Sequence, residues 1–191
     1  MGTLFNRAVR AAMLDAEFFK SAESDTSLNQ EALIVVILVS LAGSIGSFIG
    51  GLMDGGFGAA LLALIVALVV GVVNYYIWAY VTYFVGAQLF NADVDPGEML
   101  RVLGYASGPR VLSILNFIPC IGPLISLAGS IWALVAGFVG AREALDLDTT
   151  KTLITVVIGW VIVTVIGLLM LSILGVGGLA LGALGSALGG S

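Results

Sequence analysis

Three arginines and one glutamate are the side chains best suited to bind a ligand in this largely apolar chain: Arg101, Arg110, Arg142 and Glu143. A guanidinium presents a planar fork of donors that matches a carboxylate or a phosphate in bidentate contact, which lysine cannot do. These residues are therefore candidate contacts for an acidic segment of a partner or for a lipid head group. A solvated border of positive charge at the edge of a membrane is an equally supported interpretation.

Arg110 differs from the other arginines because it lies inside an apolar segment, nine residues after Arg101. If a helix begins near Arg101, Arg110 lies about 13 Å along it, close to the middle of a bilayer. A charge at that depth costs about 2.5 to 3.5 kcal/mol unless it pairs or reaches the interface. The alternative is a helix that starts near the surface and leaves Arg110 at the interface.

The residue types that most often carry catalysis are scarce in this chain. It has no histidine and a single cysteine, Cys120, which excludes an internal disulfide and a cysteine metal cluster. No acidic residue falls inside a predicted span, and neither a G-x-S-x-G motif nor a phosphate loop occurs. Seven scattered Lys and Arg residues and a net charge of −5 argue against nucleic acid. We predict a protein that is not an enzyme and has no cofactor or metal.

The composition indicates an all-α, polytopic membrane protein in contact with lipid. The 191 residues are 60% hydrophobic and 10% charged, with a mean hydropathy of +1.14. Soluble domains carry about 25% charged residues, and about 20 apolar residues cross a bilayer as a helix.

Residues 101–145 form the segment around which the chain is organised. Two apolar arms meet at a compact turn between Pro119 and Pro123. The second arm, residues 124–141, has 18 residues without a charge and would be about 27 Å long as a helix. The pattern predicts a helical hairpin that forms spans three and four, either crossing the membrane fully or re-entrant. Its structural landmarks are Gly104, Pro109, Pro119, Pro123 and Trp132.

Three further apolar segments complete a prediction of five spans, at residues 32–51, 57–90 and 153–174. A turn at residues 54–56 separates the first two segments. The five-helix membrane domain is then residues 31–174, and the glycine-rich residues 175–191 are expected to form a flexible apolar tail. In the first span, Gly43, Gly46 and Gly50 are small residues for close helix packing, within the chain or, less favoured, between two copies.

The first 30 residues are expected to form a cytoplasmic segment. Residues 3–22 have an apolar face at helical spacing, which predicts one amphipathic helix. Such a helix lies either in the membrane interface or against a neighbouring cytosolic surface. The face is made of Phe5, Val9, Ala12, Met13, Ala16 and Phe19.

The basic residues predict which side of the membrane each end occupies. With an odd number of spans, the connections that carry Lys or Arg all fall on one face. The positive-inside rule makes that face cytoplasmic. The N-terminus is therefore expected in the cytoplasm and the C-terminus outside.

Four parts of the hairpin form a familiar pattern: residues 101–109, Ile118-Pro119, Ile131-Trp132 and 142–145. With these residues the hairpin resembles the Yip-domain family, five-span membrane proteins named for interaction with Ypt/Rab GTPases. In eukaryotes the resemblance implies a scaffold of the endoplasmic reticulum and Golgi with a long cytosolic N-terminal region. The polar N-terminal region here has about 30 residues, which favours the short form of bacterial or archaeal cell membranes, and Rab binding is not carried over.

The sequence is consistent with two functions. The favoured one is an integral membrane scaffold or an assembly or trafficking protein, with a membrane-protein partner or a second copy of itself. The alternative is a small solute transporter or channel subunit, because interrupted helices such as those around Pro109 and Pro119 often build substrate sites.

Overall fold

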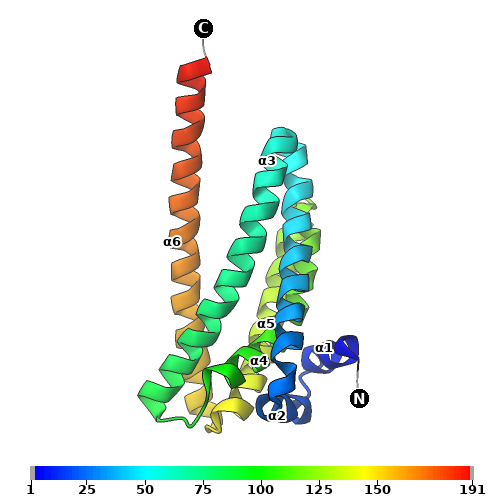
Figure 1. Cartoon of the computed structure of the whole chain (residues 1–191), viewed down its shortest axis with the longest axis vertical. Coiled ribbons are helices and arrows are strands. Elements are labelled where there is room, and N and C mark those ends of the chain that lie inside the picture. The colour runs from blue at the N-terminus through cyan, green and yellow to red at the C-terminus, as the bar shows by residue number, and fades with distance from the viewer. Residues whose placement is uncertain (1–2, 190–191) are drawn as a thin grey trace.

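The computed structural model describes the backbone of residues 3–189, and their side chains outside 54–55, 170–171 and 173–189. These residues contain helices and no strand, which confirms the all-α class (Figure 1). The elements in chain order are α1 (Leu4–Ala12), α2 (Ala16–Ser24), the 3-10 helix η1 (Thr26–Leu28), α3 (Asn29–Phe90), α4 (Pro96–Ala106), the 3-10 helix η2 (Gly108–Phe117), α5 (Ile121–Leu145) and α6 (Thr149–Gly189).

Helix α3 consists of two helices that run in opposite directions from a sharp bend at Gly56 (Figure 1). Gly56 has a φ of 76°, which residues with a side chain rarely adopt. Just before the bend, Gly51 lies so close to the backbone of Ala60 that a side chain would not fit between them. The bend therefore falls where the sequence predicts a turn.

Four helices in the described residues are long and apolar enough to cross a membrane, whereas the sequence predicts five spans. The four are Thr26–Met53, Gly56–Phe90, Ile121–Leu145 and Thr149–Leu169. The predicted third span differs because it is not one α-helix. The segment changes from α4 to η2 at Ser107, just before a glycine and a proline. A five-span count requires η2 to be the remaining crossing, and this count stays a prediction.

Local hydrogen bonds and residue types explain where α4 begins and ends. Its start has the predicted capping box, in which the Glu98 carboxylate accepts a hydrogen bond from the Asp95 backbone N–H at 3.0 Å. Its end precedes Gly108 and Pro109; glycine weakens a helix and proline removes a backbone donor. The Ser107 hydroxyl donates to the Gly104 carbonyl at 2.6 Å, which satisfies a carbonyl in the last turn.

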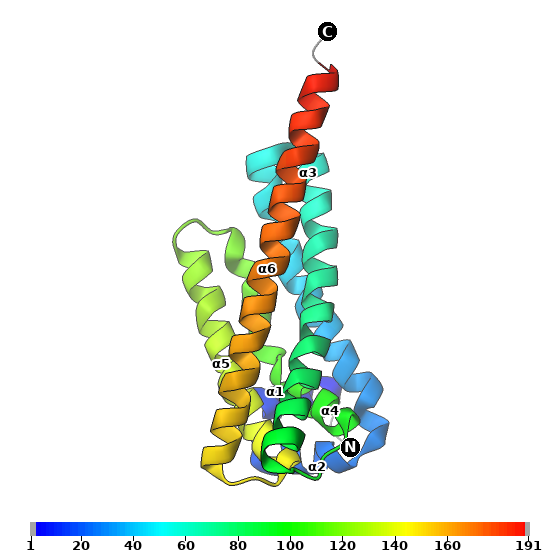
Figure 2. The same ribbon diagram turned by 90° about the vertical axis from the view of Figure 1, so that its left-hand side faces the viewer.

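The hairpin of η2 and α5 turns at residues 118–122, next to the predicted position (Figure 2). Cys120 adopts a φ of 66°, and the Gly122 N–H donates to the Ile118 carbonyl at 2.8 Å. Pro123 then lies in the first turn of α5, where a missing N–H breaks no helical hydrogen bond. The turn points to the same end of the bundle as the bend of α3 but stops short of it (Figure 2).

The native Cys120 tests whether this hairpin crosses the membrane fully. Cys120 is exposed at the turn and is the chain's only cysteine. In sealed right-side-out vesicles, we expect a membrane-impermeant maleimide to label Cys120. A Ser27→Cys chain with Cys120→Ser should react only after the vesicles are opened. Labelling of Cys120 only in detergent would identify a re-entrant hairpin, and external labelling of position 27 would contradict the predicted sidedness.

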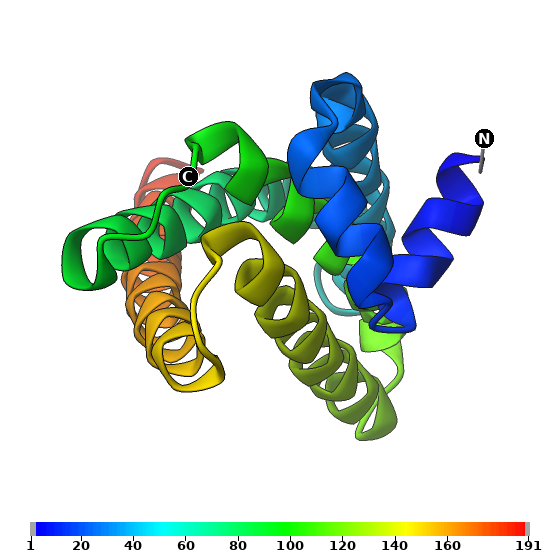
Figure 3. The same ribbon diagram turned by 90° about the horizontal axis from the view of Figure 1, so that it is seen from below.

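The N-terminal segment forms two helices rather than the predicted single amphipathic helix (Figure 3). The break is at Leu14, which has a φ of 64°, and the Asp15 carboxylate then accepts the Phe18 N–H at 3.1 Å to start α2. The predicted apolar face is divided, since Phe5 on α1 is 72% exposed and Phe19 on α2 is fully buried. Contact of α1 with the membrane interface stays a prediction.

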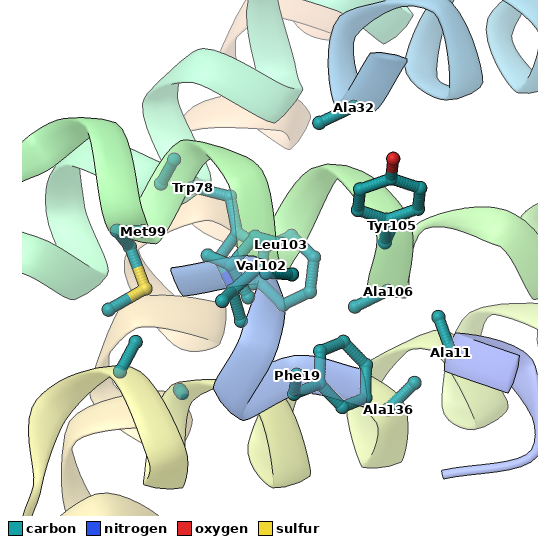
Figure 4. Packing of buried hydrophobic residues seen from close by; sticks show 14 of the residues in the cluster. Ala11, Phe19, Ala32, Trp78, Met99, Val102, Leu103, Tyr105, Ala106 and Ala136 are labelled. Carbon is teal, nitrogen blue, oxygen red and sulfur yellow. The ribbon is translucent and has the colours of Figure 1, made fainter. Parts of the chain in front are cut away.

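The buried core lies at the end of the bundle where α1, α2, α4 and α5 meet (Figure 4). Seven of the eleven residues of α4 are buried, which makes this short helix the centre of the core. Phe18 and Phe19 of α2 pack here, and small residues such as Gly140 admit them: a side chain at Gly140 would overlap Val102 and Phe19.

Helix α6 continues to Gly189, whereas the glycine content of residues 175–191 predicts a flexible tail. Alanine and leucine, both strong helix formers, alternate with these glycines. In an apolar environment a helix also satisfies every backbone donor internally. The division of the chain at residue 174 does not coincide with a helix end.

Candidate functional site

Arg101 lies in the core and holds the end of α2. Its side chain is 4% exposed, and its Nε donates to the Ala22 carbonyl at 2.9 Å. Nη1 donates to the Asn29 side-chain oxygen at 2.9 Å, and Nη2 donates to the Glu23 carbonyl. The last carbonyls of a helix lack partners within it and carry partial negative charge, so a buried cation is favourable there. The interpretation of Arg101 as a contact for a lipid or a partner does not fit this geometry.

Trp132 holds α1 in the same way. Its indole Nε1 donates to the carbonyl of Ala12, the last residue of α1, at 2.7 Å. At the C-terminal end of each N-terminal helix, backbone carbonyls therefore accept hydrogen bonds from a side chain of the segment that contains α4, η2 and α5. These two hydrogen bonds add to the apolar packing of α1 and α2 in the core.

A polar cluster of Arg7, Glu31 and Tyr105, which the sequence analysis does not predict, also links α1 to α3 and α4. The Glu31 carboxylate accepts hydrogen bonds from the Arg7 guanidinium and, at 2.8 Å, from the Tyr105 hydroxyl. Burial raises the pKa of the Tyr105 phenol, and its hydrogen bond to Glu31 adds to that effect. Tyr105 therefore stays protonated as the donor. The ionic contact with Glu31 raises the pKa of Arg7, so the pair stays charged.

Arg142 and Glu143 lie in the last turn of α5, and neither takes part in the hydrogen bonds of Arg101. Arg142 is exposed in the last turn, where a positive charge favours the helix end. Glu143 is half-buried near the Glu23 carboxyl, whose pKa is raised by burial and then by repulsion from Asp146, Glu98 and Glu143. This end of the bundle thus carries acidic and basic side chains together.

Arg110 is the one predicted arginine that faces a cavity. It is half-buried in η2 and lines two cavities of about 310 Å³ each. Val70, Asn74 and Ser130 also line both cavities, so the two adjoin at Arg110. These neighbours belong to candidate spans, which places Arg110 among the membrane-spanning helices rather than at the buried core.

The predicted small residues divide into packed and open positions. A side chain at Gly43 would meet the Ser113 hydroxyl, and one at Gly46 would meet the backbone carbonyls of Ser113 and Ile114. Gly50 has no neighbouring atom within 4 Å of such a side chain. The first two glycines therefore bring α3 against η2, which is packing within the chain.

Two hairpin landmarks also lie at close contacts between elements. Gly104 lies against Ala32 of α3. The carbonyl of Pro109 lies against Gly129 of α5, so the break in the first arm touches the second arm. In the described part of the chain, no group of three or more His, Cys, Asp and Glu side chains is placed to hold a metal ion.

A helical bundle with four helices able to cross a membrane defines an integral membrane protein. A family model, the Yip1 domain, matches residues 4–189, and the chain belongs to the Yip1-domain family. This match confirms the resemblance seen in the sequence. The Yip1 family is a non-enzymatic membrane protein family. The comparisons with curated proteins and with solved structures give no significant match.

Proposed function

We propose that this protein is a non-catalytic membrane scaffold that holds a helix of another membrane protein or of a second copy of itself. The observation that carries the proposal is the second half of α3. Only 6% of its most apolar stretch is buried within the chain, against 28–33% in the other three candidate spans. In this stretch few residues are buried against the rest of the chain, whereas the later part of the same helix contributes Trp78 and Ala79 to the core.

Residue size favours a partner helix over lipid on this surface. Ala59 and Ala63 are spaced by four residues on the poorly buried stretch, and nothing lies within 4 Å of a side chain built at Gly58. Small residues at that spacing let the backbones of two membrane helices approach closely. The buried core lies at the other end of the bundle and anchors the helix that carries this surface.

A photo-crosslinker placed on this helix tests the proposal in the native membrane. Ile65 is half-exposed, and a crosslinker there should give an adduct with a stoichiometric protein partner, identified after mild-detergent purification and mass spectrometry. The matched position is Leu127, an exposed apolar residue of α5, where we expect lipid adducts only. Lipid adducts alone at both positions would overturn the proposal.

We also propose that the end of the bundle with α1, α2 and α4 faces the cytoplasm. Arg7, Arg10 and Lys20 lie in or beside α1 and α2, and Lys151 lies in the first turn of α6. Figure 1 places these elements at one end of the bundle, which supports a single side that carries the Lys and Arg residues. The labelling of Cys120 and of position 27 tests the same assignment.

The break between α4 and η2, beside a polar cavity, favours small-solute transport as the second candidate function. The test is solute flux into liposomes that hold the purified chain. Flux that Arg110→Gln abolishes would show that the protein is a transporter and not a scaffold.

A further inference from the structure

The two cavities around Arg110 contain polar side chains within a largely apolar lining. They lie among α3, η2, α5 and α6, where the neighbouring residues are mostly apolar. Six serines and two asparagines line the second cavity, and no acidic residue lines either one. Each volume, about 310 Å³, falls within the range of about 300 to 1,000 Å³ found for small-molecule sites.

Arg110 brings an uncompensated positive charge into this space. Among the side chains that the structure describes, none forms an ion pair with Arg110, and its guanidinium donates no hydrogen bond to them. Arginine does not lose its proton in proteins, so the guanidinium stays charged in this cavity. A charge at such depth is costly unless something pairs with it.

Neutral donors lie beside Arg110 in these cavities. Asn74 lines both cavities and has an amide that can donate, and the serines of the second cavity have hydroxyl groups. A guanidinium is a donor that cannot accept. The site thus offers positive charge and donors, which an anion with several acceptor oxygens satisfies.

We propose that the Arg110 cavity binds a phosphate-class oxyanion. A cation is repelled by Arg110, and an apolar ligand leaves the guanidinium without an acceptor. A phosphate oxygen pair matches the fork of an arginine, and serine hydroxyls and the Asn74 amide supply further donors. The oxyanion has two possible sources, the head group of an anionic lipid or free inorganic phosphate. This site is separate from the α3 surface proposed for a partner helix.

Thermal unfolding of the purified full chain in phosphatidylcholine nanodiscs tests the site. The probes are inorganic phosphate in one series and phosphatidylglycerol in the other, because a ligand that binds the folded state raises its Tm. We expect the native chain to respond to one of them, and Arg110→Gln to respond with at least about tenfold lower apparent affinity. Arg142→Gln removes the same charge from an exposed position and should respond like the native chain.

The outcomes separate the two sources and the failure of the proposal. A response to inorganic phosphate identifies a soluble anion, and a response to phosphatidylglycerol alone identifies a lipid head group. No response of the native chain to either probe, or an equal response of native and Arg110→Gln chains, overturns the site.

A second variant keeps the test decisive if Arg110→Gln does not fold. Asn74→Asp places a carboxylate of nearly the same shape in both cavities, where it can pair with Arg110. We expect this chain to have at least the native Tm without an anion, and to lose the response by at least about tenfold. A full response of Asn74→Asp would equally overturn the proposal.

Discussion

Replacing Arg101 by methionine is expected to lower the free energy of unfolding by about 3 to 5 kcal/mol, because three hydrogen bonds of one buried guanidinium are lost together. The change removes the donors for two carbonyls of α2 and for the Asn29 side chain, and leaves those acceptors at the edge of the core. A charged hydrogen bond contributes about 1.5 to 3 kcal/mol, and buried groups left unpaired add to the loss.

Thermal unfolding and limited proteolysis in mild detergent measure this effect. Arg142→Met is the matched control, because Arg142 is exposed and its loss should change stability by no more than about 0.5 kcal/mol. Arg101→Lys should give an intermediate loss, since a compact ammonium cannot meet three acceptors with the geometry of a guanidinium. Cleavage within residues 3–24 should increase with the Arg101 changes. Equal losses from the Arg101→Met and Arg142→Met chains would show that Arg101 does not hold α2.

The same alanine substitution at two glycines one helical turn apart is expected to have opposite effects. A methyl group at Gly46 would lie 2.8 Å from the carbonyl oxygens of Ser113 and Ile114, which are backbone atoms and cannot rotate away. Overpacking of this kind lowers the free energy of unfolding by about 1 to 3 kcal/mol. At Gly50 there is no atom within 4 Å, so alanine should raise it by about 0.5 to 1 kcal/mol through helix propensity.

Thermal unfolding of the two variants at equal protein concentration decides between these expectations. A gain from Gly46→Ala would contradict the contact between α3 and η2. Size-exclusion chromatography in detergent addresses the alternative interpretation of these glycines. If Gly50→Ala dissociates a dimer instead of stabilising a monomer, Gly50 serves packing between two chains.

Several parts of the fold follow from local signals in the sequence. The apolar segments predict the two halves of α3, helix α5 and the first part of α6, because each is long enough to cross a bilayer. Glycine and proline predict the bend at Gly56 and the hairpin turn, since these positions need a positive φ or lose a donor. The capping box at Asp95 predicts the start of α4.

Other features have no local signal. The break at Leu14 has no glycine to indicate it, although leucine adopts a φ of 64° there. The partners of Arg101 include two backbone carbonyls, which every residue possesses, so no side chain in the sequence identifies them. Glu31 and Tyr105 are 74 residues apart, and only the fold brings them together. The polar cavity likewise collects isolated serines from separate helices, and in the sequence only Arg110 indicates it.

The contacts that hold the N-terminal helices set an order for biogenesis. Arg101 reaches α2 across 79 residues, and Trp132 reaches α1 across 120. During synthesis, which proceeds from the N-terminus at about 5 to 20 residues per second, both halves of α3 emerge before either contact can form. Phe18 and Phe19 therefore spend that interval without their core partners, beside a membrane that already receives the first helices. The part of the protein made first therefore gains its contacts only after residue 132 has been made, and translation halted before residue 101 should leave it sensitive to protease.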